Sequence, residues 1–232
     1  MRAVIYQHEP HEGLGRFEPA LKVAGFSLVK RFRGTEYRHD VEAELLVILG
    51  GSVGVRDAEL NPFIHEERSV LVERLRTGKP MLAICFGAQL LASAAGAEVF
   101  EGKNGLELGV APIRWTAEAL KDPVIAGVSS KTLVAHWHRD TWKPVEGATL
   151  LGSTERYTQQ AIRIGESYAF QCHPELTAAD WARWLEVHRE SLIADGKDLA
   201  ALEAQGAKLA SAAPELDALA ERLVHHFVKT VS

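Results

Sequence analysis

The sequence predicts an α/β fold in which a mostly parallel central sheet is flanked by helices. Through the first hundred residues, short apolar runs alternate with amphipathic stretches, as expected when crossover helices cover both faces of a sheet. The runs 45–49 and 81–84 are apolar at every position, which is typical of parallel strands buried on both faces. Beyond residue 174 the pattern becomes helical, which predicts a helical C-terminal tail.

Four strands are expected in the first part of the chain, at 3–6, 27–32, 45–49 and 80–85. Between the last two, Asn61 and Pro62 are a helix start signal, and apolar residues recur at near-helical spacing from Ile64 to Leu75. The segment 77–80 ends this helix. The two most apolar strands and the helix between them therefore form one strand-helix-strand unit, and these strands are expected to lie centrally.

The second half of the chain predicts a small antiparallel addition to the sheet, with short runs at 108–115, 132–136 and 160–164 separated by turn residues. Helices are expected at 179–187, 192–210 and 214–228, with 206–214 as a candidate for a mobile connection. No internal repeat or long linker is visible. Residues 1–232 are therefore expected to form a single domain, with a core of about 1–190 and a helical C-terminal extension of about 191–232.

Composition excludes several classes of protein. The chain has 232 residues, enough to bury a substantial core, and a net charge of −5, which gives no basic field to attract nucleic acid or a membrane surface. Its two cysteines, Cys85 and Cys172, are too few for a disulfide framework. The N-terminus turns polar early, and no apolar run reaches the roughly 18 residues of a membrane span. A cytoplasmic location is expected.

Cys85 is the first candidate for chemistry. It ends an apolar strand and passes through small residues into an apparent helix, in the segment MLAICFGAQLLA at 81–92. A sharp strand-to-helix turn of this kind presents a nucleophile at the carboxyl end of a sheet, and a helix N-terminus favours a thiolate. From this segment alone, a catalytic thiol and an inert buried cysteine are equally good interpretations.

The second candidate is the segment YAFQCHPE at 168–175. An extended His173-Pro174-Glu175 places the His and Glu side chains on one side of the backbone, where Glu175 reaches a ring nitrogen. In a Cys-His-acid site, the carboxylate orients the imidazole, which takes the thiol proton and returns it to the leaving amine. Alone the tripeptide is weak evidence, because it is more often plain turn chemistry. Cys172, next to His173, points to the opposite face and is expected in the core.

The third candidate is the glycine-rich loop LGGSVGV at 49–55, directly after a buried strand. Glycine lets backbone N–H groups approach a ligand closely, so the loop can complete an oxyanion hole. A phosphate-binding loop is the rival interpretation. It ranks low, because the loop lacks the Gly-Lys-Ser/Thr ending of a nucleotide loop and the full dinucleotide fingerprint.

Four segments taken in order resemble the class I (triad-type) glutamine amidotransferases: the Gly50-Gly51 loop, CFGAQLLA at 85–92, WHRD at 137–140 and QCHPE at 171–175. The match spans roughly residues 45–175. It looks closest to stand-alone members similar to the glutaminase part of GMP synthases. The resemblance implies the flavodoxin-like architecture of that family, with the small antiparallel addition and helical tail already expected.

The resemblance also implies a reaction. Cys85 would attack the side-chain amide of glutamine to give a γ-glutamyl thioester and ammonia, and water would then release glutamate. His173 and Glu175 would complete the triad.

The resemblance extends to residues that contact the substrate. The backbone N–H groups of Gly51 and Phe86 would hold the oxyanion. Gln89 and the backbone around Trp137 and Asp140 would bind the amino-acid portion of the substrate.

The chain departs from the family pattern at three positions. Ala83 and Arg139 stand where the family commonly has Gly, and Ser52 stands where Pro often follows the Gly pair. Ala83 is small enough to be harmless. A guanidinium at 139 suits recognition of a carboxylate on a larger substrate, although the sequence favours a solvent-facing arginine.

Neither a metal nor a cofactor is expected. The histidines considered as ligands show no spacing that joins them to acidic or thiol ligands: His8, His11, His65, His188, His225 and His226. Trp181 and Trp184 fit packing at helical spacing rather than a cofactor site.

Three functions remain open on the sequence. The first is a glutamine amidotransferase subunit that acts on glutamine and passes ammonia to a synthase on a separate polypeptide. The second is a γ-glutamyl peptide or amide hydrolase with the same triad, since only the leaving amine differs. The third is a non-catalytic or redox-sensing relative in which the elbow cysteine is structural or oxidised.

Overall fold

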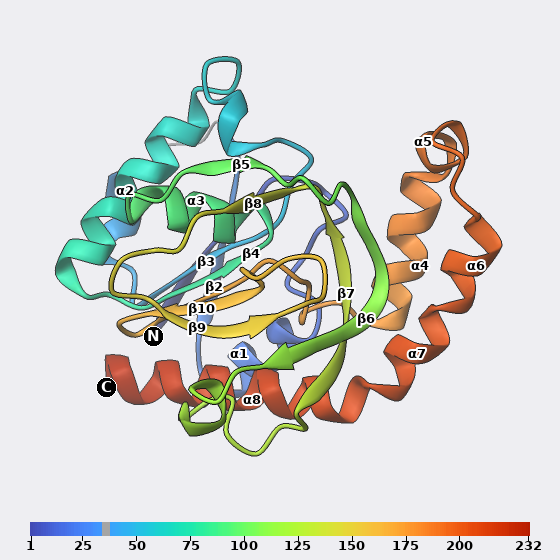
Figure 1. Ribbon diagram of the computed structural model, residues 1–232. Coiled ribbons are helices and arrows are strands. Elements are labelled where there is room, and N and C mark those ends of the chain that lie inside the picture. The colour runs from blue at the N-terminus through green and yellow to red at the C-terminus, as the bar shows by residue number, and fades with distance from the viewer. Residues whose placement is uncertain (34–37) are drawn as a thin grey trace.

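The computed structural model describes residues 1–33 and 38–232 and is built around a nine-stranded sheet in the order β2-β1-β3-β4-β11-β10-β9-β6-β7 (Figure 1). A separate two-stranded sheet pairs β5 with β8. The strands are β1 (Arg2–Gln7), β2 (Ser27–Phe32), β3 (Leu45–Ile48), β4 (Met81–Ile84), β5 (Val99–Glu101), β6 (Glu107–Trp115), β7 (Lys131–His138), β8 (Asp140–Trp142), β9 (Thr149–Ser153), β10 (Ala161–Ile164) and β11 (Ser167–Phe170). The helices are α1 (Phe17–Val23), α2 (Phe63–Thr77), α3 (Phe86–Ala94), α4 (Ala178–Val187), α5 (Arg189–Ala194), α6 (Leu199–Ala204), α7 (Gly206–Ser211) and α8 (Ala213–Val231), with short 3-10 turns at Arg38–Glu42, Val55–Asp57 and Ala119–Lys121.

The sheet has a parallel and an antiparallel half. Strands β2, β1, β3, β4 and β11 pair in parallel, whereas β11, β10, β9, β6 and β7 pair antiparallel. The predicted mostly parallel central sheet with an antiparallel addition is confirmed, and β3 and β4 lie in its interior. The carboxyl ends of β3, β4 and β11 therefore meet at one edge, which brings three distant chain segments together.

The two faces of the parallel half are covered by different helices (Figure 1). Residues 3, 5, 45, 47, 82 and 84 belong to one core cluster with α1 and α8. The intervening residues 4, 6, 46, 48, 81 and 83 belong to a second cluster with α2 and α3. The alternation follows from the two-residue period of a strand, so continuous apolar runs are needed where both faces are buried.

The predicted strand-helix-strand unit is present. Helix α2 begins at Phe63, directly after Asn61-Pro62, and ends at Thr77, where Gly78 caps it in the left-handed conformation with φ +69°. Arg74 of this helix is fully buried, and its guanidinium donates hydrogen bonds to the carbonyls of Ala43 (2.8 Å) and Pro80 (2.7 Å). Five donors on one planar group can satisfy several loop carbonyls at once, so Arg74 ties the helix to the loops beside β3 and β4.

The tail differs in detail from the sequence prediction. The stretch 192–210 forms parts of three short helices rather than one, because Gly196 adopts a positive φ and Asp198 caps α6 by accepting from the N–H of Ala201 (3.0 Å). Residues 206–214, the candidate mobile connection, are mostly helical. Leu209 and Ala212 are buried in a third core cluster, which holds the segment in place.

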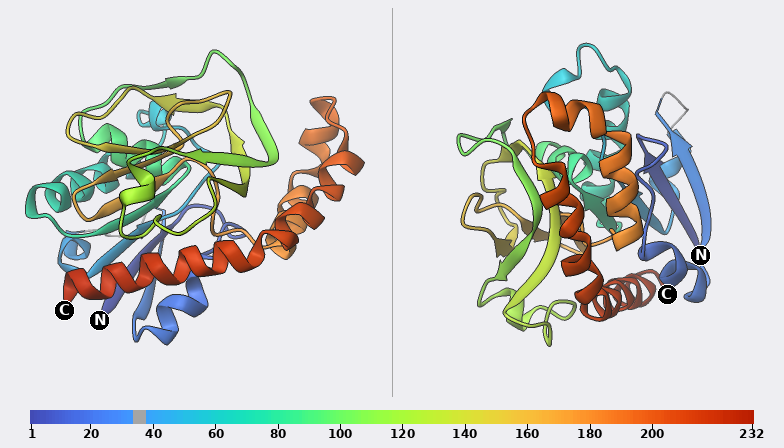
Figure 2. Two further views of the ribbon diagram at one scale, coloured as in Figure 1. Left: turned by 60° about the horizontal axis from the view of Figure 1, so that its bottom comes forward. Right: turned by 90° about the vertical axis from the view of Figure 1, so that its right-hand side faces the viewer.

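The tail helices pack on the sheet rather than extending from it. Figure 2 shows α4, α6 and α7 beside β6 and β7, while α8 runs across the face that also carries α1. Across residues 1–33 and 38–232, none of the helices combines the length and the apolar character needed to traverse a lipid bilayer.

Candidate active site

Cys85 occupies a strained turn between β4 and α3. Its backbone has φ +52° and ψ −111°, and it is the one non-glycine residue with positive φ in the described part of the chain. Such a conformation costs of the order of 1–3 kcal/mol and persists only where the surroundings enforce it. Gly87 shows how tightly the elbow is packed, because a Cβ there would lie 2.3 Å from the carbonyl oxygen of Ile48. The predicted strand-to-helix elbow is therefore present.

The elbow lies beside the segment that carries His173. The N–H of Cys85 donates to the carbonyl of Phe170 (2.7 Å), at the end of the neighbouring parallel strand β11. The chain then continues from β11 through 171–175. The N–H of His173 donates to the carbonyl of Ala135 on β7 (2.8 Å), which fixes the start of this segment on the opposite side.

His173 and Glu175 form a buried pair. The ring Nδ1 lies 2.7 Å from Glu175 Oε1, and the residues are 1% and 3% exposed. The pairing predicted from the sequence is present, although the segment turns after His173 instead of running extended. Burial lowers the pKa of His173, but the charges of Glu175 and Cys85 and the hydrogen bond to Glu175 outweigh it and raise that pKa well above its usual value.

The side chains of Cys85 and His173 both lie next to Gly50. A Cβ atom added to Gly50 would lie 3.4 Å from His173 Cε1 and 3.6 Å from Cys85 Cβ. Nε2 of His173 is buried and makes no hydrogen bond within the described residues, so it remains available for a proton from the thiol. Sγ of Cys85 lies 3.8 Å from the carbonyl oxygen of Trp137. The sulfur is therefore directed at the cavity wall rather than into the core.

A cavity of about 220 Å³ opens in front of Cys85. Its lining includes every residue that the resemblance assigned to substrate or oxyanion binding. The lining residues are Gly51, Ser52, Val53, Gly54, Arg56, Asp57, Cys85, Phe86, Gln89, Trp137, His138, Arg139 and Asp140. A larger hollow of about 920 Å³ lies between α1 and α8. Neither Cys85 nor any other site residue predicted from the sequence lines it.

Two of the candidate binding residues already have partners. Gln89 donates from Nε2 to Oε1 of Gln171 (3.1 Å). Asp140 pairs with Arg56, whose Nη2 lies 3.0 Å from Oδ1. Sequence reasoning missed Arg56, since it lies in the 3-10 turn after the glycine loop and has no motif.

Arg139 lies at the rim of the cavity with half of its side chain exposed, and its Nη1 is 3.8 Å from Glu101. This is the solvent-facing arrangement that the sequence favours. Cys172 lies in the core, as the sequence predicts, and is 1% exposed. Burial raises the pKa of its thiol well above the usual value.

Glu12 is a further carboxyl group at the site, and sequence reasoning missed it. It is 8% exposed, and a Cβ on Gly50 would lie 2.4 Å from its Oε2, so a side chain at position 50 would have to displace this carboxylate. Burial raises the pKa of Glu12 to about 7; the charge of His173 opposes this effect and that of Glu175 adds to it. Glu12 lies in the loop after β1, far from residues 173–175 in sequence, so no local pattern marks it.

His8 contacts the glycine-rich loop that contains Gly50. Its Nδ1 lies 2.8 Å from the carbonyl oxygen of Gly50, and its Nε2 lies 3.0 Å from Glu67 Oε2 on α2. Both ring nitrogens are thus occupied in holding the loop that reaches Cys85.

The chain is similar to known proteins along most of its length. A family model described as glutamine amidotransferase class-I matches residues 28–186. A glutamine amidotransferase-like protein of Salmonella typhimurium, YfeJ, is 28% identical over 204 residues, which cover 85% of this chain and 84% of that protein. A crystal structure of a glutamine amidotransferase from Thermotoga maritima superposes with a TM-score of 0.87, covering 99% of this chain and 98% of that one at 27% identity. The chain belongs to the class I glutamine amidotransferase family.

Two further relatives match over shorter stretches. A GMP synthase of Symbiobacterium thermophilum is 33% identical over 138 residues, which cover 56% of this chain but only 24% of the synthase. A gamma-glutamyl-L-1-hydroxyisopropylamide hydrolase of a Pseudomonas species is 30% identical over 135 residues, covering 52% of this chain and 43% of the hydrolase. These alignments concern only part of each of those proteins.

Proposed function

We propose that the chain hydrolyses the side-chain amide of glutamine through a Cys85-His173-Glu175 triad, and releases glutamate and ammonia. The observation that carries the proposal is that the strained Cys85 elbow lines a cavity and the buried His173–Glu175 pair lies close behind it, next to Gly50. A nucleophile, a base and a carboxylate that orients the base are the groups that acyl transfer needs.

In the first half of the proposed reaction, Nε2 of His173 accepts the thiol proton and Sγ of Cys85 attacks the amide carbon. The carbonyl π electrons move to oxygen, where the N–H groups of Gly51 and Phe86 hold the oxyanion. Phe86 is the first residue of α3, so its N–H has no partner within the helix. Collapse of the intermediate breaks the C–N bond, and the leaving amine takes the proton from His173 as ammonia.

In the second half, water attacks the γ-glutamyl thioester and gives its proton to His173. The C–S bond breaks, glutamate leaves, and the proton returns to Cys85. Glu175 holds the ring through Nδ1 and stabilises the imidazolium that forms twice in each cycle. The raised pKa of His173 supports this role, because the charges that raise it are those of the other two triad members.

A γ-glutamyl amide hydrolase is the second candidate. It is supported by the similarity to the Pseudomonas γ-glutamyl amide hydrolase. Attack at the γ-carbonyl is the same in both reactions, and only the leaving amine differs. Gln89, Trp137 and Asp140 would hold the shared glutamyl portion, while Arg139 at the rim is placed to meet the leaving amine's substituent.

For the glutaminase reaction, we propose a synthase on a separate polypeptide as the acceptor of ammonia. The GMP synthases that match are about four times longer than the aligned segment, so the glutaminase part of those proteins works beside additional chain. Cys85 and Cys172 are both free thiols, which suits a reducing compartment such as the cytoplasm.

The proposal is tested by incubating the purified chain with glutamine and with a panel of γ-glutamyl amides and peptides, while ammonia and amine release are measured. We expect Cys85→Ser to lower the rate on the preferred substrate by about 10⁴-fold or more, because it removes the covalent route. The preferred leaving group, ammonia or a larger amine, decides between the two candidates.

Cys172→Ser is the matched control, because this cysteine is buried in the core and does not line the cavity. It should keep activity within a few-fold of wild type once folding is verified. If Cys85→Ser retained the wild-type rate, the triad would be rejected and a structural or redox role for Cys85 would take its place.

A further inference from the structure

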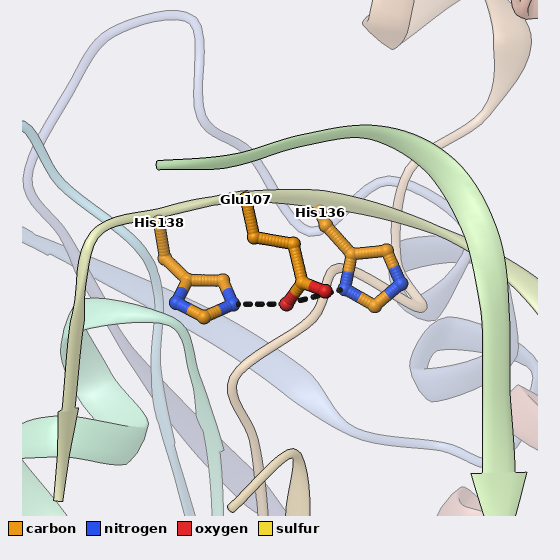
Figure 3. A group of neighbouring side chains, drawn as sticks. All are labelled: Glu107, His136 and His138. Carbon is orange, nitrogen blue, oxygen red and sulfur yellow. Dashed lines mark hydrogen bonds and ion pairs between the residues drawn. The ribbon is translucent and has the colours of Figure 1, made fainter. Parts of the chain in front are cut away.

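A second group of buried polar side chains lies next to the cavity, on β6 and β7. Glu107 is directly opposite His138 in the β6–β7 register, and His136 lies two residues before His138, on the same face of β7. Figure 3 shows the carboxylate between the two rings. All three residues are buried, and one ligand atom from each lies within 4.8 Å of the others. We call these residues the His–Glu–His cluster.

The outer nitrogens of both rings face backbone carbonyls. Nδ1 of His138 lies 3.0 Å from the oxygen of Asp140, and Nε2 of His136 lies 3.2 Å from the oxygen of Ala111. A carbonyl only accepts hydrogen bonds, so each outer nitrogen carries a proton. In a neutral imidazole the other nitrogen then has a lone pair. Both lone pairs point at Glu107, which lies 2.9 Å from His138 and 3.7 Å from His136.

Two acceptors that face each other need a hydrogen-bond donor or a cation between them. A proton shared by His138 and Glu107, or the Gln160 amide whose Nε2 lies 3.1 Å from His138 Nε2 and 2.6 Å from Glu107, would serve only one of the two contacts. Either would leave Nδ1 of His136, which is 1% exposed, without any partner within residues 1–33 and 38–232. An unpaired buried acceptor costs about 1–3 kcal/mol, so a proton alone is an incomplete solution.

Gln160 supplies a fourth polar group. Its Nε2 lies 2.6 Å from Glu107 and 3.1 Å from Nε2 of His138, while its Oε1 is buried with no partner in the described chain. The two ends of an amide exchange by a simple flip. Turned around, Oε1 would point into the cluster as an acceptor, which is favourable only if a cation lies there.

We propose that Glu107, His136, His138 and Gln160 bind a divalent transition-metal cation of the zinc class. Two imidazoles and a carboxylate are a common ligand set for this class, and the second ring nitrogen of such ligands usually donates to a carbonyl, as both do here. Zn–N and Zn–O bonds of about 2.0–2.1 Å put ligand atoms about 3.4 Å apart. The contacts of Glu107 with His138 (2.9 Å) and with Gln160 (2.6 Å) would therefore widen by less than about an ångström, and the widest separation, at most 4.8 Å, would close by about 1.4 Å or less.

The site would be structural rather than catalytic. With four protein ligands no coordination position is left open, and Thr154 orients the carboxylate by donating to Glu107 Oε1 (2.8 Å). The cation would clamp β6 and the turn directly before β10 to the end of β7. Trp137 lies between the two histidines and its carbonyl faces the sulfur of Cys85, so the clamp would also hold one wall of the cavity. Only this effect on the cavity wall depends on the proposed amidase function, and the metal site itself does not.

Metal uptake by the full-length protein, purified without a metal-binding tag and dialysed against EDTA, tests the proposal. We expect wild type to bind one equivalent of Co²⁺ with the intense visible bands of four-coordinate cobalt, and Zn²⁺ to bleach them. Zn²⁺ should also raise Tm by several degrees, since it binds only the folded chain. His136→Gln should weaken Co²⁺ binding by more than the 10- to 100-fold typical of outer-shell changes.

His226→Gln is the control, because this histidine also pairs with a carboxylate, Glu166 at 3.0 Å, but lies on α8 outside the cluster. It should bind one equivalent of Co²⁺ as wild type does. Glu107→Gln, of equal length, provides a second variant if His136→Gln does not fold. The proposal is overturned if wild type gives no four-coordinate cobalt spectrum, or if the cluster variants bind Co²⁺ as tightly as His226→Gln. No substrate enters these measurements, so an inactive amidase would leave the result unaffected.

Discussion

At the scale of single residues, the candidate site collects side chains in unfavourable states. Cys85 has a backbone conformation that non-glycine residues avoid, and Glu12 and Glu175 are carboxyls withdrawn from water. Each of these states lowers the stability of the fold unless it is compensated locally. Their concentration around His173 supports a functional origin, because strain and buried charge gather where chemistry requires them.

Glu12 permits a prediction about pH. Its pKa is raised from 4.5 to about 7 in the folded chain, so between these pH values the unfolded state releases a proton that the folded state keeps. Ionisation therefore favours unfolding as pH rises from 4.5 to 7, by about 3 kcal/mol in total. Glu12→Gln is neutral at every pH and removes this loss. Relative to wild type, its free energy of unfolding should rise by up to about 3 kcal/mol from pH 4 to pH 8.

Urea denaturation at a series of pH values measures this difference. Glu190→Gln, at an exposed position on α5, is the comparison and should follow the wild-type pH dependence. A difference between Glu12→Gln and wild type that stayed constant across the range would contradict the assigned burial of an ionising group.

At the scale of elements, the turn that carries Glu175 is held by residues far from it in sequence. The guanidinium of Arg16 donates to the carbonyls of Pro174 (2.9 Å) and Leu176 (2.7 Å), and its third nitrogen pairs with Asp217 on α8. The backbone N–H of Arg16 also donates to the carbonyl of Glu175 (2.9 Å). Arg16 is therefore a positioning residue for the carboxylate that orients His173.

Arg16→Lys should separate this role from simple charge. Lysine keeps the positive charge but cannot reach both carbonyls and Asp217 in one plane. We expect a loss of about 1–3 kcal/mol in stability and a fall in kcat of about 10- to 100-fold, with a smaller change in KM. Asp217→Asn removes only a half-exposed ion pair and should cost about 1 kcal/mol or less. Equal kcat values for the two variants would argue against positioning by Arg16.

The elements were predictable where a local pattern forms them. Strands β3 and β4 are apolar at every position, and α2 has a start signal and a glycine stop, so their bounds agree with the sequence to within a residue or two. Cys85, His173 and Glu175 could be proposed from the sequence because each lies in a short motif. Glu12, Arg16 and Arg56 were missed because their contacts cross strands and helices, and no spacing along the chain reports them.

The His–Glu–His cluster had a weak signal that was overlooked. His136 and His138 are two residues apart in a predicted strand, which puts both rings on one face. Their acidic partner Glu107 lies on the neighbouring strand, and only the β6–β7 register brings it opposite His138. A ligand search confined to isolated histidines therefore could not detect this group.

At the scale of the whole molecule, the C-terminal tail packs on both the core and the candidate site. Trp184 of α4 meets the ring of His173 edge-on at 4.9 Å, and Trp181 packs against Trp137 at 5.8 Å. Beyond residue 190, ten apolar side chains are buried: Leu192, Leu202, Leu209, Ala212, Leu216, Leu219, Ala220, Leu223, Val224 and Phe227. The tail thus shares two of the three core clusters.

This arrangement supports our proposal that residues 1–232 form one cooperative domain. Fully burying a large apolar side chain stabilises a fold by about 1.5–3 kcal/mol, whereas an entire domain is stable by only about 5–15 kcal/mol. Removing residues 191–232 should therefore abolish cooperative folding, even though it spares every triad residue. Full-length protein should unfold in urea with coincident transitions in far-ultraviolet circular dichroism, tryptophan fluorescence and amidase activity. The extension would be a folding unit of its own if the truncated chain kept a cooperative transition. The same conclusion would follow if the chain of residues 1–232 lost part of its circular dichroism or fluorescence signal at a lower urea concentration than its activity.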